Sequence, residues 1–595
     1  MTLDRPSSTP AALLWLLAFA AVLSHLTAVG FDFAQDDFVS LARAMGSDTV
    51  PDASARFWTT TATWSIFAPL FGSDPAPYHG VALMLLAGVV VFAARITSRL
   101  TQTSTTASAA TAGLLILLGP TTSLPVAWVS ASNELWAALF ALVALDRWLV
   151  PGGARTNVVA AVVAAILSLH SKESALLLGP VFFLAGRWLL RAESTGSRRT
   201  RLVLSLVVTL AAVHAAQRVF VTFRPDGDGA YAFADAGKIV VHFTQIVAWA
   251  VSPLPLALDV TGISTGLGAL VLAAGIVHAK RAALVGDDVP MLLLILGCGA
   301  ALPAAAIGRG PEPYHALLPS VIAAVWLGRI LGPRLDAWFT APSTRRIVVA
   351  GVAVAVTVFM AFGIDVRLRA RGDDGQLRHP ELRRTTVANA VRSQLSSLAT
   401  ARPQPTAIGV LQASRLDLED ASSETGEAFF VGSPVYMALA GQAGLDVLSR
   451  GGPEARWVTH VDDVPDGGFV FLDPGDAVLR PLGPPSNARL YAALIGVAAG
   501  QFQRARHDLW SAIADQGVQV RFAFDPAHLP ITPEELDAEA AAFVTYLRDS
   551  LGADGTTTNL RVLRLFEQLY ETVRGKELVR DLDDLAPERA RRFDR

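Results

Sequence analysis

The chain has 595 residues, of which 52% are hydrophobic and only 17% are charged, and its mean hydropathy is +0.42. Because a soluble protein carries about 25% charged residues, this composition predicts a membrane protein and excludes disordered and collagen-like chains. The net charge of −3 excludes a basic nucleic-acid-binding protein. The single cysteine, Cys298, excludes a disulfide framework and a cysteine-based zinc site.

Charge is unevenly distributed along the chain. Residues 1–364 contain 23 Lys/Arg and 19 Asp/Glu, whereas residues 365–595 contain 26 and 33. We therefore expect a polytopic transmembrane domain over 1–364, a juxtamembrane helical linker over 365–402 and a soluble domain over 403–595. The predicted fold class is a polytopic α-helical membrane protein with about 11 transmembrane helices and a C-terminal extracytoplasmic α/β or α+β domain.

Apolar stretches close to the length that crosses a bilayer, about 17–25 residues, recur through the first domain. The first stretch lacks a small-residue cleavage site, so we interpret it as a retained anchor. Residues 239–258 are also apolar, but a crossing there would reverse the arginine-rich loops that follow. We therefore interpret them as a helix at the outer interface, ended by Pro253 and Pro255. The expected spans are 11–29, 78–94, 108–126, 131–150, 156–170, 174–190, 202–222, 263–279, 290–308, 314–332 and 346–364.

Arginine positions predict the orientation of these spans. Residues 187–201 contain five arginines, so this segment is expected in the cytoplasm. Counting spans outward from it leaves the N-terminus in the cytoplasm and the C-terminal domain outside. The sequence thus predicts a multi-pass protein of the cell (inner or plasma) membrane. The loops expected on the external face are 30–77, 120–131, 170–174, 223–262 and 307–315.

The C-terminal domain alternates between short apolar runs and longer periodic runs. It contains no Gly-rich phosphate loop, metal-ligand cluster or nucleophile elbow, which favours a binding or positioning role over chemistry. Expected strands are 407–412, 468–473 and 518–525, and expected helices lie near 427–443, 488–515, 533–551 and 559–579.

Acidic residues lie at the boundaries of two external loops. Asp36 and Asp37 follow the first span in the segment FDFAQDDFVSLARA. Carboxylates at a membrane boundary are costly to desolvate and tend to be functional, although either residue also fits a helix cap. Glu134 lies at the apolar boundary of a later loop, beside Trp128 and Trp136, which are typical interface anchors.

The hairpin SLHSKESALLLGP (168–180) contains Lys172, one of four lysines in the chain, next to Glu173. The alternative interpretation of this pair is a surface ion pair worth less than about 1 kcal/mol. Cations that face acidic residues at a membrane surface suit a phosphate-bearing lipid headgroup. Further polar candidates on the same face are Arg218 at the outer end of a span, and Arg309, Tyr314 and His315 in the segment AIGRGPEPYHALLPS.

Several of these stretches resemble the GT-C superfamily of polytopic glycosyltransferases. The resemblance rests on the early external Asp-Asp, on V-A-W-V-S…E-L-W-A-A-L-F, and on L-x-S-K-E-S-A-L-L-L-x-P. The segment YHALLPS (314–320) resembles the R-Y-x-Y-L-P-S stretch of a late external loop. The most similar branch is the protein O-mannosyltransferase-like enzymes, including the transmembrane-and-tetratricopeptide mannosyltransferases and their bacterial relatives. The resemblance covers about residues 10–335.

The resemblance implies a glycosyltransferase that transfers a hexosyl or pentosyl group. Its donor is a polyprenyl-phosphate-linked sugar, and its acceptor is a protein, glycan or lipid hydroxyl on the external face. The family's first-loop acid corresponds to Asp36 or Asp37, and its external Lys-Glu pair to Lys172 and Glu173. The chain departs from the family where Pro313, rather than arginine, precedes the tyrosine. It also shows no tetratricopeptide repeats.

The chemistry requires a base for the acceptor hydroxyl. We assign this role to Asp37, with Asp36 as the alternative, and expect inversion at the anomeric carbon. Positive charge for the leaving lipid phosphate is expected from Lys172, Arg218, Arg309 or His315. No metal ligands are assigned; a divalent metal is compatible with the paired acids, but the pair does not indicate one.

Two other functions fit parts of the sequence. A transporter or flippase of lipid-linked sugars would carry charges mid-span and broken helices in paired halves, whereas most charges here lie in loops. A non-catalytic membrane scaffold that displays the C-terminal domain is the third interpretation. Membrane lipids are expected partners under all three, and no nucleic acid is expected.

Overall fold

A computed structural model gives the architecture of the chain, which is mostly helical and divides into two compact units, residues 1–383 and 384–595. The residues that the structure describes are 9–46, 57–101, 105–150, 155–188, 195–222, 233–251, 261–308, 310–339, 377, 380–401, 403–412, 434–458, 461–465, 467–473, 479–485 and 488.

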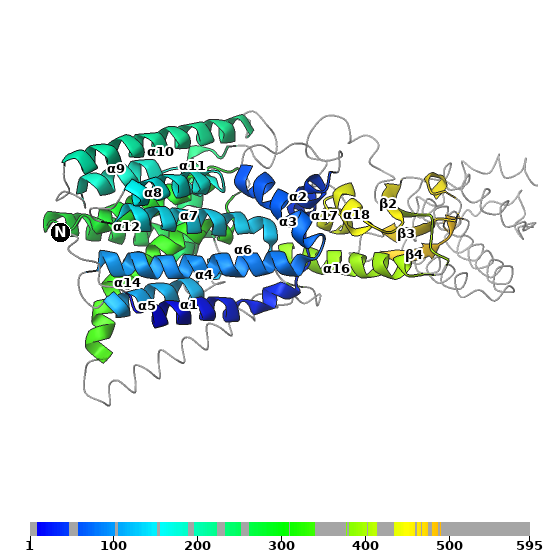
Figure 1. Ribbon diagram of the computed structural model, residues 1–595, viewed down its shortest axis with the longest axis horizontal. Coiled ribbons are helices and arrows are strands. Elements are labelled where there is room, and N and C mark those ends of the chain that lie inside the picture. Colours follow the sequence, from blue (N-terminus) through cyan, green and yellow to red (C-terminus); the bar gives the residue numbers. More distant parts are fainter. Residues whose placement is uncertain are drawn as a thin grey trace, which may run out of the picture. The chain divides into compact units, whose positions relative to one another are not determined.

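Unit 1 is a bundle of apolar helices (Figure 1). Six helical segments are long and apolar enough to cross a membrane: Ala11–Gly30, Pro75–Leu100, Val129–Trp148, Arg199–Gln217, Ile263–Leu284 and Pro313–Trp338. This confirms a polytopic helical protein of membrane-spanning composition. Its elements are α1 (Ala11–Ser24), η1 (Leu26–Gly30), α2 (Asp36–Ala44), η2 (Phe57–Ala62), α3 (Thr63–Phe71), α4 (Pro75–Leu100), α5 (Thr105–Leu118), η3 (Pro120–Thr122), α6 (Ser123–Ala127), η4 (Val129–Ser132), α7 (Asn133–Trp148), α8 (Arg155–Leu169), η5 (Glu173–Ala175), α9 (Leu178–Trp188), α10 (Thr195–Thr222), α11 (Ala236–Val251), α12 (Thr261–Leu284), α13 (Val289–Ala305), η6 (Pro313–Ala316) and α14 (Leu317–Phe339).

The expected spans up to residue 332 all contain described helices, and the last one, 346–364, lies outside the described residues. Six of these expected spans match the six long helices, whereas 108–126, 156–170, 174–190 and 290–308 match shorter apolar helices. The stretch 108–126 is not continuous, because α5 ends at Leu118 and Gly119 is extended before Pro120. Proline disfavours helical geometry in the residue that precedes it. This break turns residues 120–132 into short helices at one end of the bundle.

Within the apolar segment at 239–258, the described residues up to Val251 belong to α11, which has 16 residues and is one of the shorter apolar helices. It packs against α12, α13 and α14. Its Ile246 lies in a buried cluster with Ala301 and Ala305 at the end of α13, and the ring of His242 is 3.1 Å from the Ala305 carbonyl. Pro253 and Pro255, expected to end the helix, lie outside the described residues.

Small residues allow the helices of unit 1 to approach closely. A Cβ on Gly328 of α14 would lie 2.8 Å from the Cβ of Ala112 in α5. Gly332, one turn further along α14, faces Ser108 of the same helix. In α4, a Cβ on Gly88 would lie 2.9 Å from a Leu139 methyl of α7. Because lipid removes most of the hydrophobic drive for helix association, close contact between small residues is a main source of packing energy in membranes.

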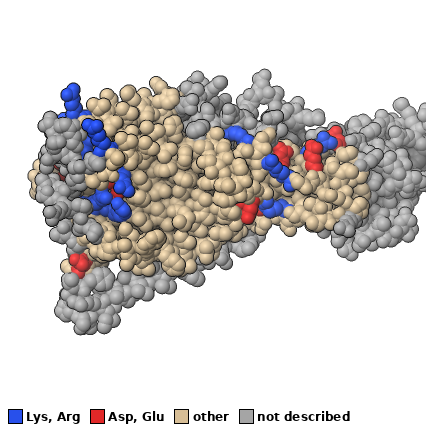
Figure 2. Space-filling view, in the orientation of Figure 1, with Lys and Arg blue, Asp and Glu red and all other residues tan. Residues whose placement is uncertain are grey.

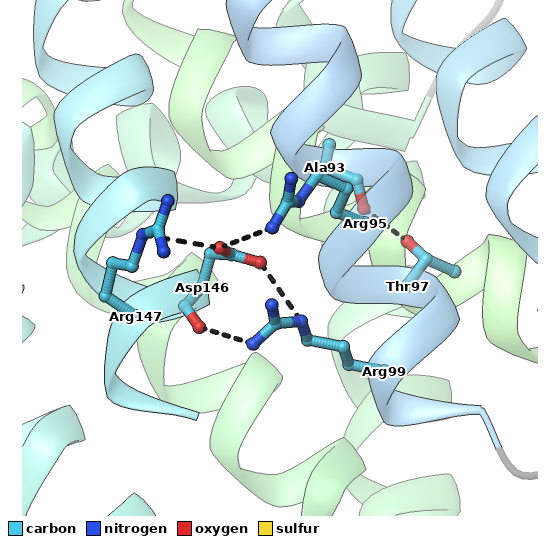
Figure 3. A network of polar contacts seen from close by, with 6 residues as sticks. All are labelled: Ala93, Arg95, Thr97, Arg99, Asp146 and Arg147. Carbon is cyan, nitrogen blue, oxygen red and sulfur yellow. Dashed lines mark hydrogen bonds and ion pairs between the residues drawn. The ribbon is translucent and has the colours of Figure 1, made fainter. Parts of the chain in front are cut away.

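Basic side chains (Lys and Arg) gather at one end of unit 1 (Figure 2). At the ends of α4 and α7, the buried carboxylate of Asp146 lies 3.2 Å from Arg99 Nε, 3.3 Å from Arg95 and 3.9 Å from Arg147 (Figure 3). Nearby, the buried Arg201 donates to the carbonyls of Trp148 and Val150. We call this the arginine end.

Unit 2 contains a four-stranded sheet in the order β2-β1-β3-β4. Its strands are β1 (Ala407–Gln412), β2 (Glu454–Val458), β3 (Phe469–Asp473) and β4 (Arg480–Gly483), and its helices are α16 (Pro380–Ala399), α17 (Pro434–Ala438) and α18 (Gln442–Leu448). Strand β1 pairs in parallel with β2 and β3, while β3 and β4 are antiparallel. Both β1 and β3 coincide with expected strands. The helix expected near 427–443 is interrupted at Gly441, which has a φ of +65°.

Most of α16 belongs to unit 2, because the unit boundary lies between Arg383 and Arg384. The side chains of Val391 and Leu395 are buried, and Gln394 Nε2 donates to the Leu479 carbonyl, 2.8 Å away. The boundary therefore falls inside the segment expected to be a linker, 365–402. The expected elements beyond residue 488 lie outside the described residues.

Candidate functional site

Asp37 and Asp36 begin α2, and the fold separates them. Asp37 is fully buried, whereas Asp36 on the next face of the helix is exposed. The Asp37 carboxylate accepts a hydrogen bond from the backbone amide of Ala34, 3.0 Å away, and another from that of Ser130, 2.6 Å away. Gln35, which precedes the helix, has a φ of +49°. A non-glycine residue in this region is strained, and here it turns the chain so that Asp37 points into the protein.

The environment of Asp37 favours its protonated form. Burial raises the pKa of this carboxyl to about 7, against the opposing effect of the hydrogen bonds from Ser130 and Ala34. The negative charge of Asp36 adds to the increase. A carboxyl that titrates near neutral pH is suited to accept and release a proton under physiological conditions.

Trp128 connects the loop that holds Asp37 to η6. Its indole Nε1 donates to the carbonyl of Ala34, 3.2 Å away, the residue whose amide binds Asp37. Its ring meets the Tyr314 ring edge to face, with centroids 6.0 Å apart. The sequence predicted an interface anchor at this position, but the side chain is buried inside the protein. The position in the segment VAWVS carries no signal that would have distinguished the two roles.

Lys172 lies between two carboxylates. Its ammonium is 3.5 Å from Glu134 Oε1 at the start of α7 and 3.6 Å from Glu173 Oε1 in η5. All three side chains are buried, and Ser174 Oγ donates to Glu134 Oε2 at 3.3 Å. The alternative of an exposed surface ion pair is therefore wrong. Because one ammonium faces two carboxylates, the trio carries a net charge of −1.

Tyr314 and His315 of η6 complete the group. The Lys172 ammonium lies 5.9 Å from the centroid of the Tyr314 ring, a cation–π distance. His315 is buried, and its Nδ1 accepts a hydrogen bond from the Glu312 amide at 2.9 Å. Neutral His315 therefore carries its proton on Nε2.

Hydrogen bonds between loops hold this end of unit 1 together. The Trp58 amide donates to the His170 carbonyl at 3.2 Å, and Thr59 Oγ1 donates to the Ser171 carbonyl at 3.0 Å. Both bonds join η2 to the segment that precedes Lys172. In addition, the hydroxyls of Thr121 and Ser320 are 2.7 Å apart, which joins η3 to α14. The site is thus built from segments that are far apart in the sequence.

The structure does not describe the side chains of two residues that the sequence predicts for the site. Arg309 lies outside the described residues, and Arg218 lies in α10 with its side chain outside them. Along α10, Arg218 is 17 residues beyond Arg201, or about 25 Å towards the opposite end of the helix. Its backbone therefore lies far from the arginine end.

The sequence interpretation missed Asp32, which is buried two residues before Ala34 and accepts a hydrogen bond from the Phe33 amide at 2.7 Å. A carboxylate just after a span is the signal that could have identified it. Within the described ranges, no group of three or more His, Cys, Asp or Glu is arranged to hold a metal ion.

Comparison with protein-family models finds no match, and neither does comparison with curated proteins.

Proposed function

We propose that the chain is a membrane glycosyltransferase that transfers a sugar from a polyprenyl-phosphate-linked donor to an acceptor hydroxyl, with Asp37 as the base. The observation that carries the proposal is the placement of Asp37. It is a buried carboxyl whose pKa is raised to about 7, and it is linked through Trp128 and Tyr314 to the buried Lys172. The GT-C resemblance of the same segments supplies the reaction class.

In this reaction the acceptor oxygen attacks the anomeric carbon as its proton passes to the Asp37 carboxylate. The bond between the anomeric carbon and the phosphate oxygen breaks, and its electron pair leaves with the lipid phosphate. Attack opposite the leaving group inverts the anomeric centre. Two of the lone-pair positions on the carboxylate are occupied by the amides of Ala34 and Ser130, which fix the side chain and leave others to receive the proton.

The leaving phosphate needs positive charge. Lys172 cannot supply it alone, because Glu134 and Glu173 together outweigh the charge of its ammonium. We assign it to Arg218, Arg309 and His315, the further cations that the sequence predicts on the same side of the membrane. The two glutamates then act chiefly to hold the ammonium in place beside Tyr314.

The distribution of charge supports an enzyme rather than a transporter. In α7, Glu134 lies in the first turn and Asp146 near the end, about 18 Å apart along the axis. The residues between them are apolar. A carrier that moves a charged headgroup across the membrane would need polar groups along this interval. The arginine end is proposed to face the cytoplasm, and Asp37, at the opposite end of unit 1, is proposed to face the external side of the cell membrane.

The test is sugar release from polyprenyl-phosphate-linked donors by the purified full-length protein, with peptide, glycan and lipid acceptors compared. We expect Asp37→Asn to lower turnover about 100-fold or more while donor binding is kept. Thermal stability should fall to some extent, because the amide nitrogen of Asn cannot accept the hydrogen bond of Ala34 or Ser130 that one carboxylate oxygen accepted. Asp36→Asn is the matched control. It removes one negative charge, as Asp37→Asn does, but from an exposed side chain that is not proposed to contact the acceptor. Donor binding without turnover in the wild-type protein would overturn the proposal in favour of a carrier or scaffold.

A further inference from the structure

A groove lies on the surface of unit 1 between α4, α7 and α8. Its volume is about 630 Å³, and its walls are formed largely by apolar side chains, among them Phe92, Phe140 and Val163. The exceptions are Arg155 and Thr156, the first two residues of α8. The groove is therefore an apolar channel with polar groups at one end.

The polar end of the groove is the arginine end of unit 1. Phe92 lines the groove, and the guanidinium of Arg95 lies 5.5 Å from the centroid of its ring. Arg95 in turn pairs with Asp146, which Arg99 and Arg147 also contact (Figure 3). Three guanidinium groups thus surround one carboxylate, which leaves the cluster with a net charge of +2.

Arg155 adds a further positive charge inside the groove itself. Its side chain is exposed, and among the described residues it makes no hydrogen bond or ion pair. A cation at the mouth of an apolar groove, beside a cluster that is already positive, attracts a ligand with an anionic head and an apolar tail.

The groove runs along most of α8 (Arg155–Leu169). From Arg155 to Leu167, which also lines it, α8 rises about 18 Å, and an acyl chain that crosses half of the hydrocarbon core, about 15 Å, fits within that length. The walls are open to the outside, since Val159 and Val163 are 54% and 51% exposed. An acyl chain that enters at Arg155 would reach Phe140 without leaving the groove.

We propose that this groove binds an anionic phospholipid of the leaflet at the arginine end. The phosphate lies between Arg155 and the cluster of Arg95 and Arg147, and one acyl chain follows α8 past Val159 and Val163. The proposed headgroup site lies at the opposite end of α7 from Ser130 and Asp37, so the proposal does not rest on the proposed function. A zwitterionic lipid has the same tail but no net charge, and it binds less tightly.

The test is native mass spectrometry of the full-length protein, equilibrated with equal amounts of phosphatidylglycerol and phosphatidylcholine that have matched acyl chains. We expect the wild-type protein to retain phosphatidylglycerol at least fivefold over phosphatidylcholine. Arg155→Gln should reduce this preference threefold or more. The matched control is Arg281→Gln, which removes an exposed arginine from α12, outside the groove, and should leave the preference unchanged.

A second pair of variants tests the tail. Val163→Trp fills the groove and should lower retention of both lipids, whereas Leu210→Trp, on the exposed face of α10, should not. Equal retention of the two lipids by the wild-type protein would overturn the proposal. An equal reduction of the phosphatidylglycerol preference in Arg155→Gln and Arg281→Gln would also overturn it, because the overall positive charge of the surface would then explain the preference. Unchanged retention in Val163→Trp would exclude the groove as the tail site.

Discussion

The ammonium of Lys172 lies 5.9 Å from the centroid of the Tyr314 ring. This contact joins the hairpin between α8 and α9 to the last described loop of unit 1. From Tyr314 the chain of contacts continues through the Trp128 ring to the carbonyl of Ala34, and so to the loop that holds Asp37. Residues proposed to act on one substrate are thus mechanically connected, which is the condition for a preorganised site.

The buried carboxyl of Asp37 predicts that the proposed glycosyltransferase activity declines on the acidic side of its pH profile. The pKa of its carboxyl is raised to about 7, so the ionised base is present above this pH and is lost as the pH falls. Measured between pH 5 and 9, kcat/KM should decline about tenfold per pH unit below about pH 7. Asp36→Asn should move this decline to lower pH, because it removes the negative charge that disfavours ionisation of Asp37. A flat profile from pH 5 to 8 would contradict the assignment.

Lys172 holds two buried carboxylates, so its removal should destabilise unit 1. In Lys172→Met, Glu134 and Glu173 lose their counter-charge, and we expect a loss of about 3–5 kcal/mol in the free energy of unfolding. Adding Glu134→Gln should recover part of that loss, since only one buried carboxylate then remains unpaired. The measurement is a double-variant cycle from denaturant or thermal unfolding in detergent. A double variant no more stable than Lys172→Met would show that the ammonium does not stabilise Glu134.

The carboxylate of Asp146 should stabilise the arginine end of unit 1. Asp146→Asn leaves Arg95, Arg99 and Arg147 close together without their shared counter-charge (Figure 3). We expect a loss of about 3 kcal/mol or more, because the carboxylate is fully buried. The control is Asp235→Asn, whose ion pair with Lys238 is exposed on both sides and should change the thermal midpoint little. An equally small change of the thermal midpoint in both variants would mean that solvent screens the ion pairs of Asp146.

The contact between α14 and α5 should not tolerate a methyl group at Gly332. A Cβ there would lie 2.6 Å from the backbone nitrogen of Ser108, which cannot rotate away. We expect Gly332→Ala to lower stability by about 1–3 kcal/mol. Gly80→Ala in α4 is the control, because its Cβ would meet nothing within 4 Å and alanine favours the helix by about 0.5–1 kcal/mol. A neutral result at Gly332 would place α5 and α14 further apart than in this structure.

Much of unit 1 could be predicted because the sequence patterns that indicate its helices lie within single segments of the chain. Composition alone identified a membrane protein, and apolar stretches located its helices, since a lipid-exposed segment must satisfy its backbone hydrogen bonds within itself. Arginine positions likewise indicated which helix ends lie together, because the rule that they follow acts on each loop separately. The break of 108–126 at Pro120 was missed, although proline is itself a local signal, because the apolar run continues past it.

The site required tertiary structure. Asp36 and Asp37 are neighbours of the same type, and the sequence could not choose between them. Successive positions on a helix point in directions about 100° apart, so only the packing of α2 decides that Asp37 is buried. Packing likewise brings Glu134 within ion-pair distance of Lys172. It also buries Trp128, which donates a hydrogen bond to the loop of Asp37 rather than lying at the membrane interface. Composition and periodicity thus determined the membrane class and its helices, whereas packing decided which polar side chains are buried together, because burial depends on neighbours far away in the sequence.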